Sequence, residues 1–332
     1  MLPEVVNRTR GKAYPLVVRD KTGRDFYAIP LKYTAHFARG GGAELLDDGP
    51  HPYPVDECYG DDGKGSIKKP SDLCEFKPGT DVILVGHAHP PLMRQVTSVD
   101  VSLRVGPIRK SVRAFGLRAW RRATFGGLSP GSARTIQEPV PLVYELAWGG
   151  MDLGDPSRPI GEPRNYLGRG VVRDAAAHVD RPAVQLEDLA GTRTPACFGA
   201  IHRHWQPRVQ FAGTFDDAWL ENKSPLLPDD FDSRYHVSVP HDQWSATPLH
   251  VDEPIEVDNA TEDGVFRARL PRLSPRFFAT IRGERKQYAT HLDTLLIDTD
   301  ARTVEATFRA AIPIPRKLQL IDEIELDEGD DA

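Results

Sequence analysis

Alternating and continuous apolar runs along the chain predict strands far more often than helices. Residues 26–33 are apolar, β-branched and aromatic, and they predict a strand despite Pro30. Residues 81–86 form a short continuous apolar run, which is typical of a strand buried on both faces. Residues 99–105 alternate between valine or leucine and polar or small residues, as in a strand with one buried face.

The C-terminal part of the sequence predicts a β-hairpin formed by residues 292–298 and 302–310. In the second segment, every other residue from Val304 to Ala310 is apolar, and the residues between them are glutamate, threonine and arginine. This period of two predicts a hairpin with one face toward the core and the other face in water.

Helical signals are few, and long irregular stretches separate the strands. Residues 216–220 predict a short helix with carboxylates at its N-terminus, and residues 175–177 predict a single turn. Residues 121–141 and 149–169 are rich in glycine and proline and predict long loops. We therefore predict a mainly β fold, with sandwich-like sheets, long Pro/Gly loops and a few short helices.

We expect residues 1–315 to form one large β-rich domain, with two β halves divided near residues 121–141 as the alternative. Seven carboxylates fall in the last eleven residues, with no lysine or arginine: Asp322, Glu323, Glu325, Asp327, Glu328, Asp330 and Asp331. Without them the chain carries 41 acidic and 42 basic residues and is nearly neutral. Such a run repels itself, and it predicts a disordered acidic tail over residues 316–332 that is dispensable for folding.

The composition fits a folded globular protein and excludes several classes of function. The formal net charge of -6 is too small, and of the wrong sign, for a nucleic-acid-binding protein. Residues 1–10 lack the apolar stretch of a signal peptide, and no apolar run approaches the roughly 20 residues that span a membrane. The 3 cysteines are widely spaced and indicate a reduced compartment. We expect a cytoplasmic protein without nucleic-acid or membrane partners.

No familiar catalytic motif is present: the sequence contains no GxSxG elbow, P-loop, HExxH helix or EF-hand loop. The best candidates for metal ligands are two His-x-His pairs, His87 with His89 and His202 with His204. Alternate residues of a strand point to one face, so each pair is able to converge on an ion that Asp229, Asp230 or Asp232 completes. No third ligand stands at a fixed spacing, so we expect no metal and no cofactor. A metal-dependent hydrolase that uses these pairs is the alternative function.

Aromatic residues are concentrated between residues 205 and 244: Trp205, Phe211, Phe215, Trp219, Phe231, Tyr235 and Trp244. Aromatic side chains and arginine are typical anchors of protein interfaces, but aromatic side chains also supply most of the buried area of a core beneath long loops. The acidic cluster at residues 229–232 either binds a divalent cation through its oxygen atoms or caps a turn and pairs with Arg234 or Arg208. The residues alone leave both interpretations open.

Several strings occur together in a recognisable order. They are Lys77-Pro-Gly-Thr-Asp-Val-Ile-Leu-Val-Gly-His-Ala88, Arg113-Ala-Phe-Gly-Leu-Arg-Ala-Trp120, Pro141-Leu-Val-Tyr-Glu-Leu-Ala-Trp-Gly-Gly150, Pro195-Ala-Cys-Phe-Gly199, Trp205-Gln-Pro-Arg208, Ala212-Gly-Thr-Phe-Asp216, Trp219-Leu220, Pro225-Leu-Leu-Pro-Asp-Asp-Phe-Asp232 and Gln243. Their order and spacing resemble the bacterial family DUF2169 over roughly residues 1–315. The chain departs from the family pattern with Leu117 in place of Asp, Trp148 in place of Phe and Cys197 in place of Gly.

The resemblance implies an adaptor or chaperone of bacterial type VI secretion. Proteins of this kind help to load a toxic effector onto the secretion spike, often with a PAAR-like tip protein. The resemblance carries no catalytic residues, so we expect a protein-binding function and no enzyme activity. The expected partner-binding residues are Trp205, Arg208, Trp219, Asp229, Asp230, Phe231 and Asp232, and we also expect Phe231 to fill the core beneath its turn.

Overall fold

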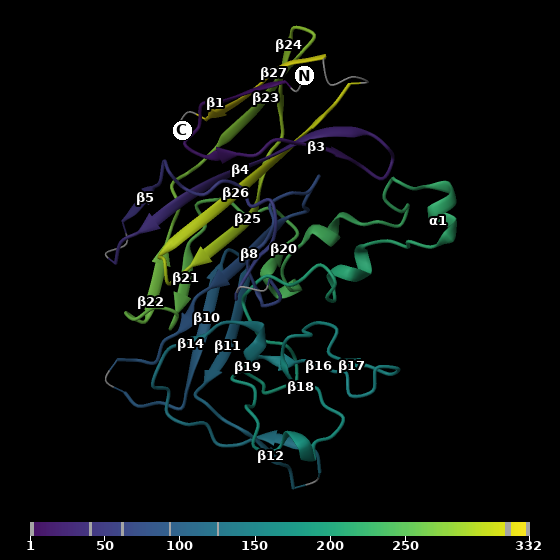
Figure 1. Cartoon of the computed structure of the whole chain (residues 1–332). Coiled ribbons are helices and arrows are strands. Elements are labelled where there is room, and N and C mark those ends of the chain that lie inside the picture. Colours follow the sequence, from purple (N-terminus) through teal and green to yellow (C-terminus); the bar gives the residue numbers. More distant parts are fainter. Residues whose placement is uncertain are drawn as a thin grey trace.

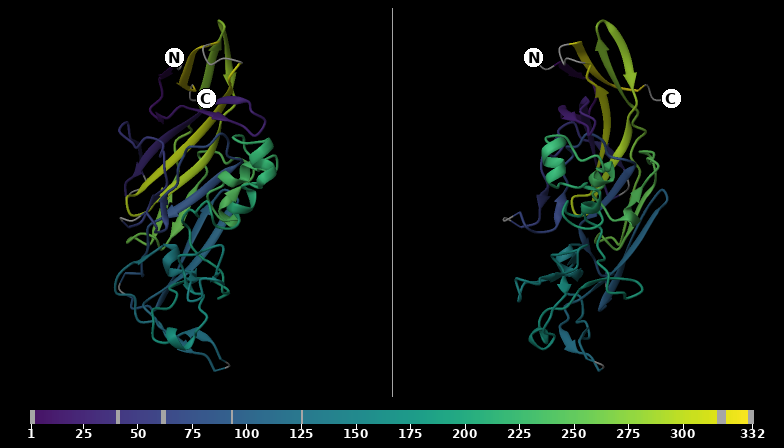
Figure 2. Two further views of the ribbon diagram at one scale, coloured as in Figure 1. Left: turned by 45° about the vertical axis from the view of Figure 1, so that its right-hand side comes forward. Right: turned by 90° about the vertical axis from the view of Figure 1, so that its right-hand side faces the viewer.

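The computed structural model describes residues 3–39, 42–60, 63–92, 94–124, 126–315 and 320–329. Within these ranges the chain is mainly β, with one α-helix, α1 (Asp217–Asn222), which confirms the predicted fold class. The molecule is elongated, with both termini toward one end and the hairpin of β12 (Trp120–Arg122) and β13 (Leu128–Pro130) at the other (Figures 1 and 2). No helix in these ranges is long and apolar enough to cross a membrane.

An eight-stranded sheet occupies the middle of the molecule (Figure 1). Its strand order is β2-β4-β26-β25-β8-β20, and β3 and β5 also pair with β4. The bounds are β2 (Lys12–Ala13), β3 (Leu16–Arg19), β4 (Asp25–Phe37), β5 (Ala43–Leu45), β8 (Thr80–Val85), β20 (Trp244–Ser245), β25 (His291–Asp298) and β26 (Thr303–Pro313). Strands β25 and β8 are parallel, and β26 pairs with β4 antiparallel from Phe26↔Pro313 to His36↔Thr303.

Two smaller sheets flank this central sheet. The five-stranded sheet has the order β19 (Leu186–Asp188), β11 (Ile108–Phe115), β10 (Ser98–Val105), β21 (Ile255–Asp258) and β22 (Val265–Ala268). The four-stranded sheet has the order β1 (Glu4–Asn7), β27 (Ile321–Glu328), β23 (Pro275–Ile281) and β24 (Glu284–Tyr288). Each of the three sheets combines strands from both sides of residues 121–141, so a division at that segment does not separate two β halves.

The segments between the long strands, including the predicted loops at residues 121–141 and 149–169, contain short two-stranded pairs and single helical turns. The pairs are β6 (Glu57–Cys58) with β7 (Ile67–Lys69), β9 (His87–Ala88) with β14 (Val140–Pro141), β15 (Trp148–Gly149) with β18 (Arg169–Gly170), and β16 (Met151–Asp152) with β17 (Ile160–Gly161). The 3₁₀ turns are η1 (Tyr144–Leu146), η2 (Ala176–His178), η3 (Arg208–Phe211), η4 (Ser233–His236) and η5 (His241–Gln243). The turn predicted at residues 175–177 corresponds to η2.

The apolar face of the central sheet packs on the five-stranded sheet. Alternate residues of β4, among them Ile29 and Leu31, are fully buried in the same cluster as Leu103 of β10. The rings of Phe37 and Phe266 meet edge to face with their centroids 5.9 Å apart, which joins β4 to β22. The predicted strands at residues 26–33, 81–86 and 99–105 are confirmed as parts of β4, β8 and β10, and β8 is buried throughout.

The predicted C-terminal hairpin is confirmed as β25 and β26, but the prediction that its polar face lies in water is wrong. Glu305, Thr307 and Arg309 are all buried. The chain before β8 covers this face, because Arg309 donates from Nη2 to the Asp72 carbonyl at 2.7 Å and from Nη1 to the Cys74 carbonyl at 3.0 Å. The polar residues of the hairpin therefore hold a covering segment instead of facing solvent.

Two groups of paired charges make this burial possible. In the first, Lys32 on β4 lies 2.7 Å from Asp72 Oδ2 and 3.1 Å from Glu305 Oε2. The Tyr53 hydroxyl donates to Glu305 Oε1 at 2.8 Å, and the Lys32 ammonium lies 3.5 Å from the centre of the Tyr53 ring. Burial and the Glu305 carboxylate both raise the pKa of Tyr53, which keeps this hydroxyl protonated and able to donate.

The second group joins β25, β26 and the start of β8. Arg309 Nε donates to Asp293 Oδ2 at 2.6 Å, and Lys77 Nζ donates to Asp81 Oδ2 at 2.9 Å. The backbone N–H and hydroxyl of Ser238 both donate to the same Asp81 oxygen at 2.7 Å. This group therefore binds a second covering segment, residues 237–245, to the central sheet.

The acidic C-terminal segment is ordered where the structure describes it, so the prediction of a disordered tail is wrong for residues 321–328. These residues form β27, parallel to β1 and antiparallel to β23. Ile324 and Leu326 are fully buried, while Glu325 on the other face accepts from Arg8 at 2.7 Å and Arg285 at 2.6 Å. Distant arginines neutralise the carboxylates, and alternate aliphatic residues bury one face. Asp330 and Asp331 lie outside the described residues.

Truncation after Leu320 is expected to destabilise the protein, since it removes an inner strand of the four-stranded sheet and leaves one edge of β23 without its hydrogen-bonded neighbour. The single change Ile324→Ala should lower the free energy of unfolding by about 2–5 kcal/mol, measured by urea denaturation. Glu323→Ala is the matched control on the same strand and should stay within about 0.5 kcal/mol of the wild type. Equal stability of all the variants would show that β27 does not contribute to the fold.

Asp293→Asn is expected to lower the free energy of unfolding at neutral pH by about 3–5 kcal/mol, because Arg309 then stays buried without its counter-charge. Burial opposes ionisation of Asp293, but Arg309 and Lys77 outweigh it and hold the pKa of Asp293 below its ordinary value. Its contribution is therefore present above the unfolded pKa of about 3.9 and is lost as pH falls through the folded pKa.

Denaturation curves between neutral pH and about pH 2 check this dependence. The wild type should lose stability on acidification, and the Asp293→Asn variant should lose less. Asp47→Asn is the control, because Asp47 pairs with Arg10 at the exposed surface and should contribute less than about 1 kcal/mol. An Asp293→Asn variant as stable as the control would contradict the role of the buried pair.

Candidate functional site

Residues 212–232 form an arm that projects from the side of the body and carries α1 at its tip (Figures 1 and 2). We call this segment the α1 arm. It contains three of the strings that resemble the family pattern: residues 212–216, 219–220 and 225–232. The arm is therefore the place where the structure brings these strings together.

Hydrogen bonds within the arm explain why its polar residues take these positions. The Asp216 carboxylate caps α1 by accepting from the Trp219 backbone N–H at 2.8 Å, which confirms the predicted helix and its N-terminal carboxylate. The Asp230 carboxylate accepts from the backbone N–H of Thr214 at 2.9 Å and from its hydroxyl at 2.7 Å. These bonds hold the pKa of Asp230 below its ordinary value. Asp230 thus ties the end of the arm to its beginning.

A glycine is required where the two ends of the arm meet. Gly213 has φ +84°, and a Cβ there would lie 2.9 Å from Pro228 Cβ and 3.0 Å from Asp230 Oδ1. Any larger residue would combine a strained backbone with a close contact. The string at residues 212–216 and the string at residues 225–232 therefore depend on each other sterically as well as through Asp230.

The base of the arm is attached to the hairpin of β3 and β4. Lys21 donates from Nζ to the carbonyl oxygens of Asp229 and Phe231, both at 2.9 Å. Phe231 is 7% exposed and forms the buried end of the arm, as the sequence predicted. The Trp219 indole donates to the Leu226 carbonyl at 2.9 Å, which closes the arm over α1. The arm is thus held at its base while its tip extends into solvent.

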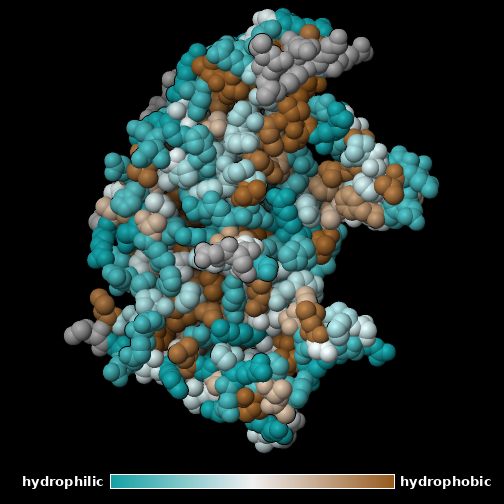
Figure 3. Space-filling model, viewed as in Figure 1, coloured by the Kyte–Doolittle hydropathy of each residue, from teal (hydrophilic) through white to brown (hydrophobic). Residues whose placement is uncertain are grey.

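The tip of the arm presents apolar side chains surrounded by carboxylates. Phe215 is 55% exposed and Leu220 is 62% exposed, and the Phe215 ring packs against the Trp219 ring with centroids 4.8 Å apart. We call Phe215, Trp219 and Leu220 the arm ridge. The exposed carboxylates of the arm are those of Asp216, Asp217, Glu221, Asp229 and Asp230. Figure 3 shows the arm as a projection on which apolar and hydrophilic residues lie side by side.

Two of the predicted partner-binding residues are buried and cannot contact a partner in this structure. Trp205 packs edge to face against Tyr144 with centroids 5.3 Å apart. Arg208 donates to the Ile201 carbonyl at 2.7 Å and the Tyr235 carbonyl at 3.1 Å. The string at residues 205–208 is therefore structural, because its tryptophan and arginine hold the covering segments together. This corrects the interface prediction for these two residues.

The remaining predicted residues lie on or near the arm. Trp219 belongs to the arm ridge, and Asp229 and Asp230 are exposed. Asp232 caps η4 by accepting from the Arg234 backbone N–H at 2.9 Å and also pairs with the Arg234 side chain. The acidic residues therefore cap turns and form ion pairs, which is one of the two roles that the sequence allowed. The Asp229 carboxylate lies at the surface beside Lys223.

The two His-x-His pairs do not assemble a metal site. His87 Nδ1 lies 2.7 Å from Asp300 Oδ2, an interaction that raises the pKa of His87. His202 Nε2 lies 3.0 Å from the Gly65 carbonyl, and burial lowers the pKa of His202. Within the described residues, no group of three or more histidine, cysteine, aspartate or glutamate side chains is placed to hold a metal ion.

The glycine-rich string near residue 150 has a packing role. Asn165 is fully buried and donates from Nδ2 to the carbonyls of Tyr144 and Trp148, both at 2.9 Å. Gly149 has φ +150°, and a Cβ there would overlap the Asn165 carbonyl oxygen. Trp148, one of the departures from the family pattern, packs edge to face against Trp120 with centroids 6.4 Å apart. This departure is therefore accommodated by a local aromatic contact.

The other two departures are also local. Cys197 is buried, and its thiol donates to the Leu142 carbonyl at 3.2 Å. Leu117 is exposed, while its neighbour Arg118 pairs with Glu187 at 2.6 Å. No charged role at position 117 is needed to hold this part of the chain.

Sequence reasoning missed Phe215, Leu220 and Lys21 as parts of the candidate site. Phe215 stood among the clustered aromatic residues, but nothing in the sequence separates an exposed aromatic ring from a buried one. An amphipathic reading of residues 215–220 would have been the available signal for Leu220. Lys21 lies about 200 positions before the arm in sequence, so no local pattern connects the two.

Phe231→Ala is expected to lower the free energy of unfolding by about 3–5 kcal/mol, because Phe231 is buried at the base of the arm. The same substitution at Phe215 is the matched control and should change stability by less than about 1 kcal/mol, since that ring is largely exposed. Urea denaturation of the two variants measures the difference. A Phe231→Ala variant as stable as Phe215→Ala would show that Phe231 does not anchor the arm.

Comparison with known proteins gives a family without a described activity. Residues 22–309 match the family described as "Uncharacterized protein conserved in bacteria (DUF2169)". No curated protein and no solved structure matches the chain. The match includes the α1 arm, the whole of β4 to β25, and most of β26. The chain therefore belongs to the bacterial family DUF2169.

Proposed function

We propose that this protein is a non-enzymatic adaptor that binds another protein through the α1 arm. Its partner is an effector of type VI secretion or the PAAR-like tip module of that effector, and its role is to hold the partner in the cytoplasm for loading onto the spike. The observation that supports the proposal is the arm ridge, an apolar surface that the body holds away from its own core. The named secretion system rests on the order of the strings that resemble the family.

The physical character of the arm favours a partner protein. Exposed aromatic and aliphatic side chains at a projecting tip contribute most of their binding energy when a partner removes them from water. The arm exposes five carboxylates, and Lys223, its one basic residue, pairs with Asp229. A complementary partner therefore has an apolar pocket bordered by lysine or arginine.

A hollow beside the base of the arm offers a second contact for the same partner. It has a volume of about 540 Å³ and lies between the arm and the β3–β4 hairpin, with Lys21, Phe76 and Phe231 among its lining residues. Phe76 is exposed at its edge. A partner that grips the ridge is able to place a side chain in this hollow, which adds contact area without a large obligate interface. Such a moderate interface suits a protein that must later release its cargo.

The double substitution Phe215→Ser with Leu220→Ser is expected to abolish co-purification of the effector encoded beside this gene. Phe215 and Leu220 are exposed, so the loss should occur without a change in melting temperature. Two ridge contacts of about 1–2 kcal/mol each correspond to at least a tenfold weaker complex. Affinity purification of the tagged protein after co-expression with the effector measures the effect.

The matched control is Val55→Ser with Leu189→Ser, which removes two exposed aliphatic side chains outside the arm. This control should retain the effector. Secretion of the effector should also depend on the gene and should fail with the arm variant alone. An effector that neither co-purifies with the wild type nor needs the gene for stability or export would reject the adaptor function. An effector that binds the arm variant normally would reject the arm as its site.

A further inference from the structure

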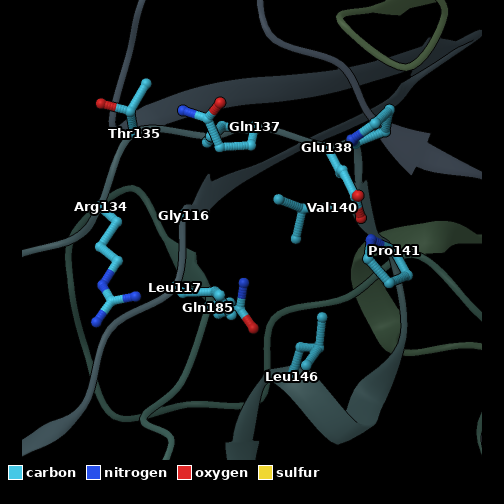
Figure 4. Close-up of a pocket in the computed structure, with 12 residues that line it drawn as sticks. Gly116, Leu117, Arg134, Thr135, Gln137, Glu138, Val140, Pro141, Leu146 and Gln185 are labelled. Carbon is cyan, nitrogen blue, oxygen red and sulfur yellow. The ribbon is translucent and has the colours of Figure 1, made fainter.

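A second surface that none of the preceding roles uses is a groove beneath residues 134–141. Its volume is about 690 Å³, within the range of roughly 300–1,000 Å³ typical of ligand sites. The lining residues come from the two positions after β11, the loop before β14, β14 itself, η1 and the residue before β19. Figure 4 shows the side chains that surround it.

The floor of the groove is apolar and belongs to the core. Ile136, Val140 and Leu146 line it and are buried, so their positions are set by packing. Leu117 forms part of the wall and is 61% exposed. The groove is therefore preformed, and it offers an exposed aliphatic contact at its opening.

Two charges of opposite sign stand on the rim of the groove. Arg134 and Glu138 line the groove and lie on opposite sides of it in Figure 4. Neither forms an ion pair or a side-chain hydrogen bond with any residue that the structure describes. The nearby Arg118, in contrast, is bound by Glu187 and the Val184 carbonyl. The rim therefore displays a positive and a negative group that are both available to a ligand.

The backbone of the rim segment is bonded to the body on alternate residues only. Arg134 donates its backbone N–H to the Leu117 carbonyl and Ile136 donates to the Val96 carbonyl, both at 2.9 Å. The N–H groups of Thr135 and Gln137 donate to none of the described residues. In an extended segment, successive N–H groups point to opposite sides, so one side of this segment has free donors.

Gly116 allows the rim segment to lie this close to β11. A Cβ at this position would overlap the Arg134 carbonyl oxygen and would lie 3.3 Å from the Ile136 nitrogen. Gly116 and Leu117 both belong to the string at residues 113–120 that resembles the family pattern. This string therefore helps to set the shape of the groove. The contact fixes Arg134 and Ile136 relative to the floor.

We propose that this groove binds an extended peptide segment of a protein partner. An aliphatic side chain occupies the floor, a carboxylate faces Arg134, a lysine or arginine faces Glu138, and peptide carbonyls accept from the free N–H groups. The four-residue separation of Arg134 and Glu138 spans at most about 14 Å, which a peptide of four or five residues matches. Alternating carbonyls distinguish a peptide from a fatty chain or a small apolar molecule, which would leave the donors and one charge unmatched.

This proposal is separate from the adaptor function of the arm, because the groove and the arm share no residue. The probes are two isomeric peptides with blocked termini, Lys-Val-Leu-Val-Glu and Glu-Val-Leu-Val-Lys, each carrying a fluorophore on a flexible linker. Fluorescence anisotropy with the full-length protein measures their affinities. One isomer should bind at least about tenfold more tightly than the other, because the two rim charges fix the direction of the peptide.

Three variants make the test decisive. The charge exchange Arg134→Glu with Glu138→Arg should reverse the preference between the two isomers. Leu117→Ser should weaken the preferred isomer at least about fivefold, and Leu189→Ser, an exposed control outside the groove, should leave it unchanged. Failure of both isomers to bind at about 1 mM, equal binding of both, or a preference that the charge exchange leaves unaltered would overturn the proposal.

Discussion

Two groups of paired charges lie buried between the central sheet and the segments that cover it, and their mutual pairing determines how this chain folds. Burial of an unpaired charge is prohibitive, so β26 could not place Glu305 and Arg309 inside unless Lys32 and Asp293 stood opposite. Once paired, these groups turn the polar face of the sheet into a second interior. That interior is what fixes the loops rich in proline and glycine, which have few helices or strands of their own.

The covering segments in turn determine what the surface presents. The Arg309 bonds to the Asp72 and Cys74 carbonyls fix the segment that continues into Glu75 and Phe76 beside the arm's base, and the Asp81 bonds to Ser238 fix the chain that follows the arm. With its base fixed by Lys21, the α1 arm can expose apolar side chains without collapsing onto the body. The apolar groove beneath residues 134–141 depends on the hydrophobic core, because buried residues form its floor. Both surfaces are thus products of a rigid frame made of sheets and paired charges.

Local patterns predicted the elements well and their environments poorly. The alternation in residues 99–105 produces a strand, and the carboxylate before α1 caps a helix, through interactions within the segment itself. Each could therefore be recognised from its own segment. The polar face of β26 has the same alternation whether it meets water or buried partners, and partners such as Asp72 come from more than 200 positions away. The strand at the acidic end of the chain was not predicted for the same reason. Arg8, which neutralises Glu325, lies at the opposite end of the chain. The resemblance to the family drew attention to the residues of the arm. Only their exposure in the structure distinguishes the arm ridge, which a partner can reach, from the buried Trp205.

The proposed adaptor function requires that a partner cover the α1 arm. Hydrogen–deuterium exchange on the free protein, and on its complex with the effector encoded beside it, tests this claim most directly. We expect amides of residues 214–223 to exchange quickly in the free protein and to become protected in the complex, while β4 and β26 stay protected in both. Protection confined to other surfaces, with the arm exchanging equally fast in the free and bound states, would contradict it.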